Sequence, residues 1–206
     1  MKRAAPSPTR RLFVLGVGLG LIAGPAWGEG FSYKGWRFNT DGARGPLSGA
    51  LIQSLQAQID IVERVDIKPS IREFFRGLPK SIVPTTPYGP GAYDFDRRAM
   101  FLSMQIDPPR NPVFLHELLH AYHQRRLPQG LKNPRIIAFF EEAGLSGRFP
   151  PQAYMLTNAA EFFAMCVSVV LWGRAARPPS TRAHVRETLP DFYDWIVAEF
   201  TPNGAL

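Results

Sequence analysis

The sequence predicts an α+β fold, in which a small mixed or antiparallel sheet is followed by a mainly helical C-terminal half. Two observations carry this prediction. Residues 80–105 contain short β-branched and aromatic stretches separated by turn residues, and the chain beyond residue 110 consists of runs with helical periodicity and capping residues. The 206 residues, 45% of them hydrophobic, suit one folded domain, which we expect over residues 29–206.

The first expected helix covers residues 46–65. Apolar residues recur there at intervals of three and four, with polar and charged residues between them, which is the pattern of an amphipathic helix. They are Leu47, Leu51, Leu55, Ile59 and Val62. A shorter helix is expected at residues 68–77, where Pro69 suits the first turn and Gly77 the end.

The expected strands lie within residues 80–105. The stretch KSIVP, at 80–84, is short and β-branched, which predicts a strand. Residues 91–105 predict a hairpin, because two apolar stretches flank the polar turn DFDRR. A loop rich in Pro and Gly connects the strand to the hairpin.

Two helices are expected next, and both begin with the same pair of residue types. Asn111 and Asn133 are the expected N-caps, and each is followed by a proline suited to the first helical position. Arg125 and Arg126 near the end of the first helix favour its carboxyl terminus. Gly144 is the expected end of the second helix.

The segment 158–173 predicts a buried helix. It is apolar on almost every side but too short to cross a membrane, so we expect it at the centre of the domain. It contains Cys166, the only cysteine, which we expect to be a buried hydrophobic residue and not a reactive thiol. One or two closing helices are expected over residues 181–200.

The first 28 residues have the layout of a cleaved export signal. Lys and Arg at positions 2, 3, 10 and 11 precede an apolar run over 12–24, and Ala26 and Gly28 suit cleavage after Gly28. The stretch TRRLFV resembles a twin-arginine signal, and an ordinary Sec signal fits as well. We therefore expect a periplasmic or secreted protein with no membrane span in the mature chain.

Removal of this segment changes the charge of the chain. Four of the 24 Lys and Arg lie in it and none of the 17 Asp and Glu, which leaves 20 minus 17, or +3. The remaining basic residues form no block, so the sequence gives no reason to expect a nucleic acid partner. It makes no prediction of oligomeric state.

Three of the four histidines lie within HELLHAYH, at residues 116–123. On a helix, residues four apart differ by about 40° in direction and roughly 6 Å in height, so His116 and His120 share one face and can bind one ion. Glu117 lies at the edge of that face. This is the HExxH arrangement, in which two imidazoles bind Zn²⁺ and the glutamate acts on water. His123 lies about 10 Å along the helix from His116, so we expect a supporting or structural role for it.

Hydrolytic zinc usually has three protein ligands and one open position. Two glutamates are candidates for the third ligand: Glu141, 21 residues after His120, and Glu161, 41 residues after it. Glu161 also has the spacing of a capping box with Asn158, and Glu141 could equally lie on a solvated helix flank. The residues alone leave both candidates open.

A family resemblance favours Glu161. HELLH followed by AYMLTNAAEFFA resembles the gluzincin zinc metallopeptidases related to anthrax lethal factor, over about residues 80–173. The resemblance implies a zincin-like fold, Glu161 as the third zinc ligand, and Tyr154, seven residues earlier, as an assisting catalytic residue. By the same analogy, residues 99–105 would be an edge strand that pairs with an extended substrate. An ordinary sheet strand is the alternative for that segment.

The expected function is that of an exported zinc metallopeptidase acting on a peptide or protein substrate. In this hypothesis Glu117 is the general base and Tyr154 stabilises the oxyanion. Two alternatives stay open: a noncatalytic envelope protein stabilised by zinc, and a zinc amidase acting on the cell wall. A structural zinc site needs neither a general base nor an oxyanion donor, which argues against the first alternative.

Overall fold

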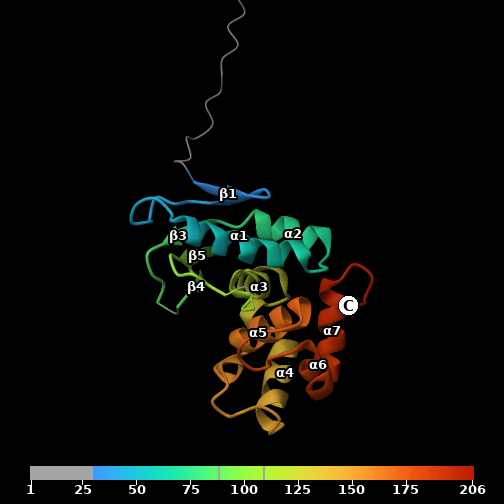
Figure 1. Ribbon diagram of the computed structural model, residues 1–206. Helices are drawn as coiled ribbons and strands as arrows, with labels where there is room; N and C mark the ends of the chain where they lie inside the picture. Colours follow the sequence, from blue (N-terminus) through green and yellow to red (C-terminus); the bar gives the residue numbers. More distant parts are fainter. Residues whose placement is uncertain (1–29, 88, 109) are drawn as a thin grey trace, which may run out of the picture.

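Helix α3 (Val113–Arg126) runs through the middle of the molecule, between the N-terminal elements on one side and the C-terminal helices on the other (Figure 1). The computed structural model describes residues 30–87, 89–108 and 110–206. The expected export signal, residues 1–28, lies outside the described residues. The fold is α+β, as predicted, with the sheet in the first half of the chain.

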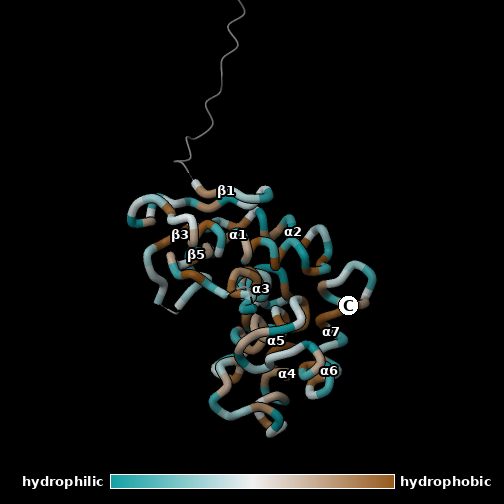
Figure 2. Tube along the Cα trace, in the orientation of Figure 1, coloured by the Kyte–Doolittle hydropathy of each residue, from teal (hydrophilic) through white to brown (hydrophobic). Residues whose placement is uncertain are grey.

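The N-terminal elements are a hairpin and two helices. Strands β1 (Phe31–Tyr33) and β2 (Trp36–Phe38) pair antiparallel, and the sequence analysis did not predict them because they are only three residues long. Helices α1 (Gly49–Arg64) and α2 (Pro69–Arg76) are confirmed, with Ser48 capping α1 through a side-chain hydrogen bond. Hydrophilic and hydrophobic residues alternate along both helices, as expected of amphipathic helices (Figure 2).

A three-stranded mixed sheet follows. Strands β3 (Lys80–Val83), β4 (Gly91–Asp94) and β5 (Ala99–Ser103) have the spatial order β3-β5-β4. Strand β5 is parallel to β3 and antiparallel to β4. The prediction that residues 99–105 form an edge strand is therefore wrong, because β5 has a partner on each side.

The free edge of this sheet belongs to β4. On the opposite edge, Asn39 exchanges backbone hydrogen bonds of 2.8 Å with Lys80 and Ile82 of β3. Within the described chain, β4 pairs only with β5. Since β4 also packs on α3, the edge of β4 that no other strand covers lies beside the HExxH residues.

Helix α3 is confirmed, but its N-terminal cap is not the predicted one. The helix has Pro112 at the cap position and no side-chain cap hydrogen bond. The Asn111 side chain instead accepts a hydrogen bond of 3.0 Å from the Ala176 backbone N–H. Asn111 thus attaches the loop after α5 to the start of α3.

Helix α4 (Pro134–Leu145) begins as predicted, since the Asn133 side chain accepts hydrogen bonds from the N–H groups of Arg135 and Ile136. A 3₁₀ turn, η1 (Gly130–Lys132), precedes it. The prediction that Gly144 ends the helix is wrong, because Gly144 lies within α4 and the chain leaves the helix at Ser146. The turn to the left-handed region comes later, at Gly147 with φ 65°.

Helix α5 (Ala159–Trp172) is buried at the centre of the C-terminal half, as predicted. A 3₁₀ turn, η2 (Tyr154–Leu156), precedes it, and Gly173 ends it with φ 98°. Cys166 is fully buried, as predicted, and burial raises the pKa of its thiol. No helix among the described residues is long and apolar enough to span a membrane.

Two closing helices complete the fold, α6 (Arg182–Thr188) and α7 (Pro190–Phe200). The Phe192 ring of α7 stacks between Phe162 of α5, at 4.8 Å, and Trp195, at 5.7 Å. Aromatic packing of this kind holds α7 against α5. The N-terminus of α5 is thereby held in place opposite α3.

Candidate metal centre

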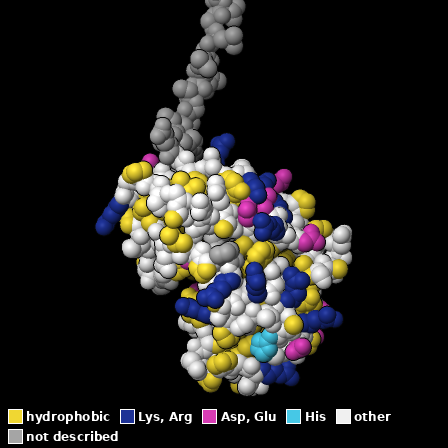
Figure 3. Space-filling view, viewed as in Figure 1, with side chains coloured by type: hydrophobic (Ala, Val, Ile, Leu, Met, Phe, Trp, Pro, Cys, Tyr) yellow, Lys and Arg dark blue, Asp and Glu magenta, His cyan; other side chains and the backbone are white. Residues whose placement is uncertain are grey.

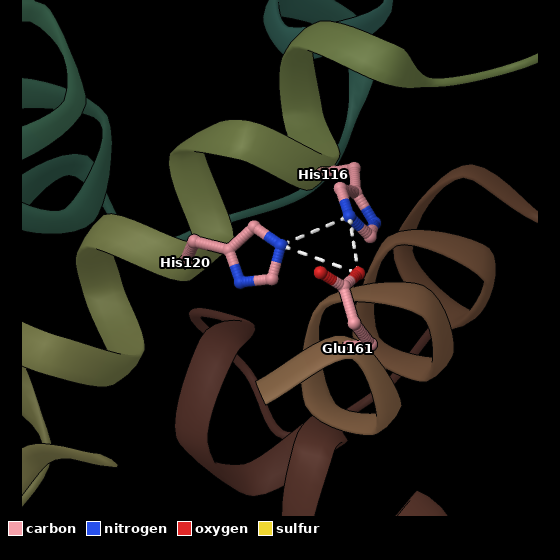
Figure 4. A group of neighbouring side chains, drawn as sticks. All are labelled: His116, His120 and Glu161. Atoms are coloured by element: carbon pink, nitrogen blue, oxygen red, sulfur yellow. Dashed lines mark hydrogen bonds and ion pairs between the residues drawn. The ribbon is translucent and has the colours of Figure 1, made fainter. Parts of the chain in front are cut away.

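Three side chains from two helices meet at one point. His116 and His120 project from α3, Glu161 projects from α5, and all three point toward one another (Figure 4). The two Nε2 atoms are 3.0 Å apart, and one Glu161 carboxylate oxygen is 3.2 Å from His116 Nε2 and 3.5 Å from His120 Nε2. Oxygen and imidazole nitrogen atoms grouped this closely could hold a metal ion.

The local structure of α3 explains the positions of the two imidazoles. His116 and His120 are one turn apart, and the apolar residues around them bury the helix against α1, β4 and α5. The side chains of His116 and His120 are 13% and 5% exposed. Their rings lie edge to face with centroids 4.6 Å apart, and Phe95 packs on the His120 ring at 5.7 Å, so packing fixes the ring orientations.

Glu161 reaches the imidazoles because it lies in the first turn of α5. Asn158 caps that helix, and its side-chain oxygen accepts hydrogen bonds of 2.9 Å from the N–H groups of Ala160 and Glu161. The cap leaves the Glu161 side chain directed at α3. Asn158 therefore caps α5 while Glu161 approaches the histidines, although a capping box and a ligand role for Glu161 were expected as alternatives.

The group is electrostatically coupled. Burial raises the pKa of Glu161, but its hydrogen bonds with His116 and His120 outweigh burial and hold that pKa well below its ordinary value. Burial lowers the pKa of His116, and its hydrogen bond with Glu161 and the nearby carboxylate of Glu117 more than reverse this. An ionised carboxylate and two unprotonated imidazoles form the state that binds a cation, so a metal would compete with the proton on His116.

Glu117 lies next to this group and is buried. Its side chain is pressed against Gly91 at the start of β4, where a methyl group would lie 2.8 Å from its Cγ and 3.0 Å from Oε1. Burial raises the pKa of Glu117, while the two histidines and a backbone hydrogen bond from Tyr93 lower it in part. The absence of a side chain at Gly91 is thus what lets Glu117 occupy its place.

A cavity of about 1080 Å³ lies beside this group. Tyr154 lines the cavity together with His116, Glu117 and Glu161. Burial and the neighbouring carboxylate of Glu161 raise the pKa of Tyr154 to about 12. The phenol therefore keeps its proton at neutral pH and can donate it in a hydrogen bond.

The remaining predicted site residues lie elsewhere. Glu141 is on the exposed flank of α4, and the three-residue group does not include it. His123 is fully buried and packs on Phe163 with ring centroids 4.6 Å apart. Burial lowers the pKa of His123 to about 4, so it is neutral at physiological pH. Packing of this kind agrees with a structural role for His123.

Gly91 and Arg177 line the cavity but are not among the site residues predicted from the sequence. Gly91 carries a signal that could have been found, since a glycine within a strand often marks close approach of another group. Arg177 carries no such signal, because it lies in a loop rich in Pro and Arg that the tertiary structure brings to the cavity.

No protein-family model matches this chain, and no match was found among curated proteins. Because a fold alone does not define an activity, the assignment of function rests on the chemistry of the site.

Proposed function

We propose that the protein is a zinc-dependent metallopeptidase of the gluzincin type, with a zincin-like fold, that hydrolyses peptide bonds. One observation carries the proposal: His116, His120 and Glu161 converge within 3.5 Å of one another, at the wall of a cavity that also contains Glu117 and Tyr154. This is the residue set that the resemblance to the lethal factor group implies. Export to the periplasm or beyond is part of the same proposal.

The separations within the group suit zinc. Zinc binds imidazole nitrogen and carboxylate oxygen at about 2.0–2.2 Å in tetrahedral geometry, which requires ligand atoms roughly 3.3–3.5 Å apart. The three observed separations, 3.0, 3.2 and 3.5 Å, lie near this range. Zinc held by these residues would lower the pKa of water and polarise the carbonyl under attack.

Glu117 is the general base in this proposal. Its carboxylate would take a proton from the attacking water and deliver it to the departing amine. Its position between α3 and Gly91 restrains the side chain, so little rotational freedom is lost during the reaction.

Tyr154 is the oxyanion donor. Its pKa of about 12 keeps the hydroxyl protonated, so it can donate a hydrogen bond to the oxyanion formed when water adds to the carbonyl. Removing such a donor typically lowers kcat by about 10²–10³.

The free edge of β4 is the expected place for the substrate backbone. Residues 91–94 line the cavity, and β5 is their only strand partner among the described residues. An extended peptide can pair with such an edge through main-chain hydrogen bonds. Strand β4, and not residues 99–105, is therefore the expected edge strand for an extended substrate.

The decisive experiment compares three variants of the zinc-loaded protein, assayed on a mixed peptide library and, separately, on peptidoglycan. Glu117→Gln is expected to keep bound zinc and lose activity by about 10²–10⁴, because only the base is removed. Glu161→Ala is expected to lose zinc, measured by elemental analysis, because a ligand is removed. Glu141→Ala is the matched control on the exposed flank of α4 and should retain both zinc and activity.

The outcomes separate the three functions considered. Cleavage of peptidoglycan but not peptides would replace the peptidase by a cell-wall amidase. Stoichiometric zinc with no hydrolysis of either substrate would favour a noncatalytic zinc protein. Full activity of Glu117→Gln would contradict the mechanism.

A further inference from the structure

The loop between α5 and α6, residues 173–181, forms part of the cavity wall through Ala175 and Arg177. The loop is held at several points. The Ala176 N–H donates to Asn111 at the start of α3, and the Ala175 N–H donates to the Ser180 carbonyl. The Arg182 side chain donates to the carbonyls of Val170 and Leu171 at the end of α5. These bonds hold the loop backbone on both sides of Arg177, whose exposed side chain lies at the cavity wall.

Arg177 lies over the Tyr154 ring, with its guanidinium carbon 5.6 Å from the ring centroid. Its positive charge lowers the pKa of Tyr154 in part, against the larger effects of burial and of Glu161. Tyr154 thus has Arg177 near its ring and Glu161 near its hydroxyl. A group bound by Arg177 would lie beside a substrate carbonyl that Tyr154 contacts.

Arg177 forms no ion pair with any carboxylate of the described residues. The other arginine of the cavity wall, Arg97, differs in this respect because it pairs with Asp94 at 3.6 Å. Several Lys and Arg side chains gather on the face drawn in Figure 3, over the C-terminal half of the molecule, with few Asp and Glu among them. The charge on Arg177 is therefore available to a ligand in the cavity.

The chemistry of arginine indicates which ligand this is. The guanidinium group is planar, always charged, and presents N–H donors in a fork that matches a carboxylate. Stacking on an aromatic ring uses the face of the guanidinium plane and leaves its edge for hydrogen bonds. A peptide supplies a carboxylate either at its C-terminus or on an Asp or Glu side chain.

We propose that Arg177 binds a carboxylate of the substrate, so that the enzyme prefers peptides carrying a C-terminal carboxylate or an acidic side chain close to the scissile bond. The inference rests on the proposed peptidase function, since it names the substrate class of the same site. It extends that function because HExxH and its third ligand specify the reaction but not the substrate.

Binding and cleavage should be measured separately. For binding, zinc-loaded Glu117→Gln protein is titrated with three N-acetylated peptides of one length. The first is amidated and has only uncharged side chains, the second has the same side chains and a free C-terminal carboxylate, and the third is amidated and contains a single glutamate. At least one carboxylate peptide is expected to bind about tenfold or more tightly than the neutral amide, because a hydrogen bond to a charged group is strong. Which of the two binds tightly identifies the source of the carboxylate.

Further variants in the same background test whether Arg177 is responsible. Arg177→Gln should reduce the preference to less than about twofold, and Arg177→Lys should restore part of it, since lysine keeps the charge but not the fork. Arg174→Gln is the matched control, an exposed arginine of the same loop that does not line the cavity, and should keep the preference. Melting curves verify that each variant is folded.

Equal binding of all three peptides, no binding of any, or an undiminished preference in Arg177→Gln would overturn the inference. Cleavage of the same peptides by protein with Glu117 intact separates this failure from that of the proposed function. Cleavage without carboxylate preference would remove only the role of Arg177. A carboxylate preference in binding with no cleavage would remove the peptidase and keep the carboxylate site.

Discussion

Glu117 of α3 packs directly against Gly91 at the start of β4. A methyl group at Gly91 would lie within 3.0 Å of two Glu117 atoms, so no larger residue fits without moving the carboxylate. The backbone of β4 therefore helps to position the proposed general base. Glycine is required here by contact and not by backbone conformation, since Gly91 is not among the residues with positive φ.

Gly91→Ala is accordingly expected to lower kcat by about 10²-fold, because a displacement of about 1 Å at a reacting group has an effect of that size. Bound zinc should be unchanged, since the atoms nearest to the new methyl group belong to Glu117 and not to a histidine. Gly144→Ala is the control, because a methyl group there meets no atom within 4 Å. Steady-state kinetics with elemental analysis make the comparison, and equal activity of both variants would rule out the positioning role.

Asp107 gives a pH dependence of stability that is independent of the site. Burial raises its pKa from 3.8 to about 6. The unfolded chain therefore releases this proton at lower pH than the folded protein, and Asp107 costs stability as the pH rises from about 4 to about 6. Its hydrogen bonds with Ser54 use only the Asp107 backbone and survive substitution of the side chain.

The melting temperature of Asp107→Asn minus that of the wild type is thus expected to increase from pH 4 to pH 7, because asparagine does not ionise. Melting temperatures of both proteins at the two pH values provide the test, and the difference between them cancels other titrating groups. A difference that stays constant, or shrinks toward pH 7, would refute the effect of burial.

Among the elements, α2 ends in an unusual way, because a lysine of the next strand satisfies its last carbonyls. Lys80 at the start of β3 is 5% exposed, and its Nζ donates to the carbonyls of Phe75, Arg76 and Leu78 at 3.2, 2.9 and 2.6 Å. Burial lowers the pKa of Lys80 to about 8, so the ammonium group still predominates at pH 7. The lysine therefore joins α2 to the sheet.

Lys80→Met keeps most of the apolar stem but removes these donors, which leaves the carbonyls of Arg76 and Leu78 unsatisfied, whereas the Phe75 carbonyl keeps the Leu78 N–H at 3.3 Å. We expect the free energy of unfolding to fall by about 1–3 kcal/mol, as is typical when a buried hydrogen-bond partner is lost. Lys132→Met, on an exposed lysine, should change it by less than about 0.5 kcal/mol. Chemical denaturation measures both, and similar values for the two variants would contradict the role of Lys80.

For the molecule as a whole, the candidate metal centre joins two parts of the chain. His116 and His120 belong to α3, which packs on α1 and the sheet, whereas Glu161 begins α5, which packs on α4, α6 and α7. A metal bound to all three residues would connect these parts. Binding restricted to the folded state raises the free energy of unfolding with the logarithm of the ligand excess over Kd.

Zinc at about a hundredfold excess over its Kd should therefore raise the free energy of unfolding by about 2.7 kcal/mol, and a chelator should reverse the change. Glu161→Ala should abolish or greatly reduce the shift, and Glu141→Ala should retain it. Thermal unfolding with and without zinc measures this without an activity assay. An undiminished shift in Glu161→Ala would exclude Glu161 as a ligand.

The sequence by itself determined the local features of this protein. The helices over 49–64, 69–76 and 159–172 follow from periodicity and capping, and the spacing of His116 and His120 places both on one helical face. These features depend on residues a few positions apart, whose geometry the backbone dictates.

Tertiary structure alone decided the rest. The spacing of the residues left Glu141 and Glu161 open and a family resemblance favoured Glu161, but only the packing of α5 on α3 brings Glu161, and not Glu141, to the histidines. The central place of β5, the attachment of Asn111 to Ala176 and the approach of Gly91 to Glu117 likewise join residues distant in sequence. Local patterns carry no information on which distant surfaces meet, because that depends on how all the apolar faces are buried at once.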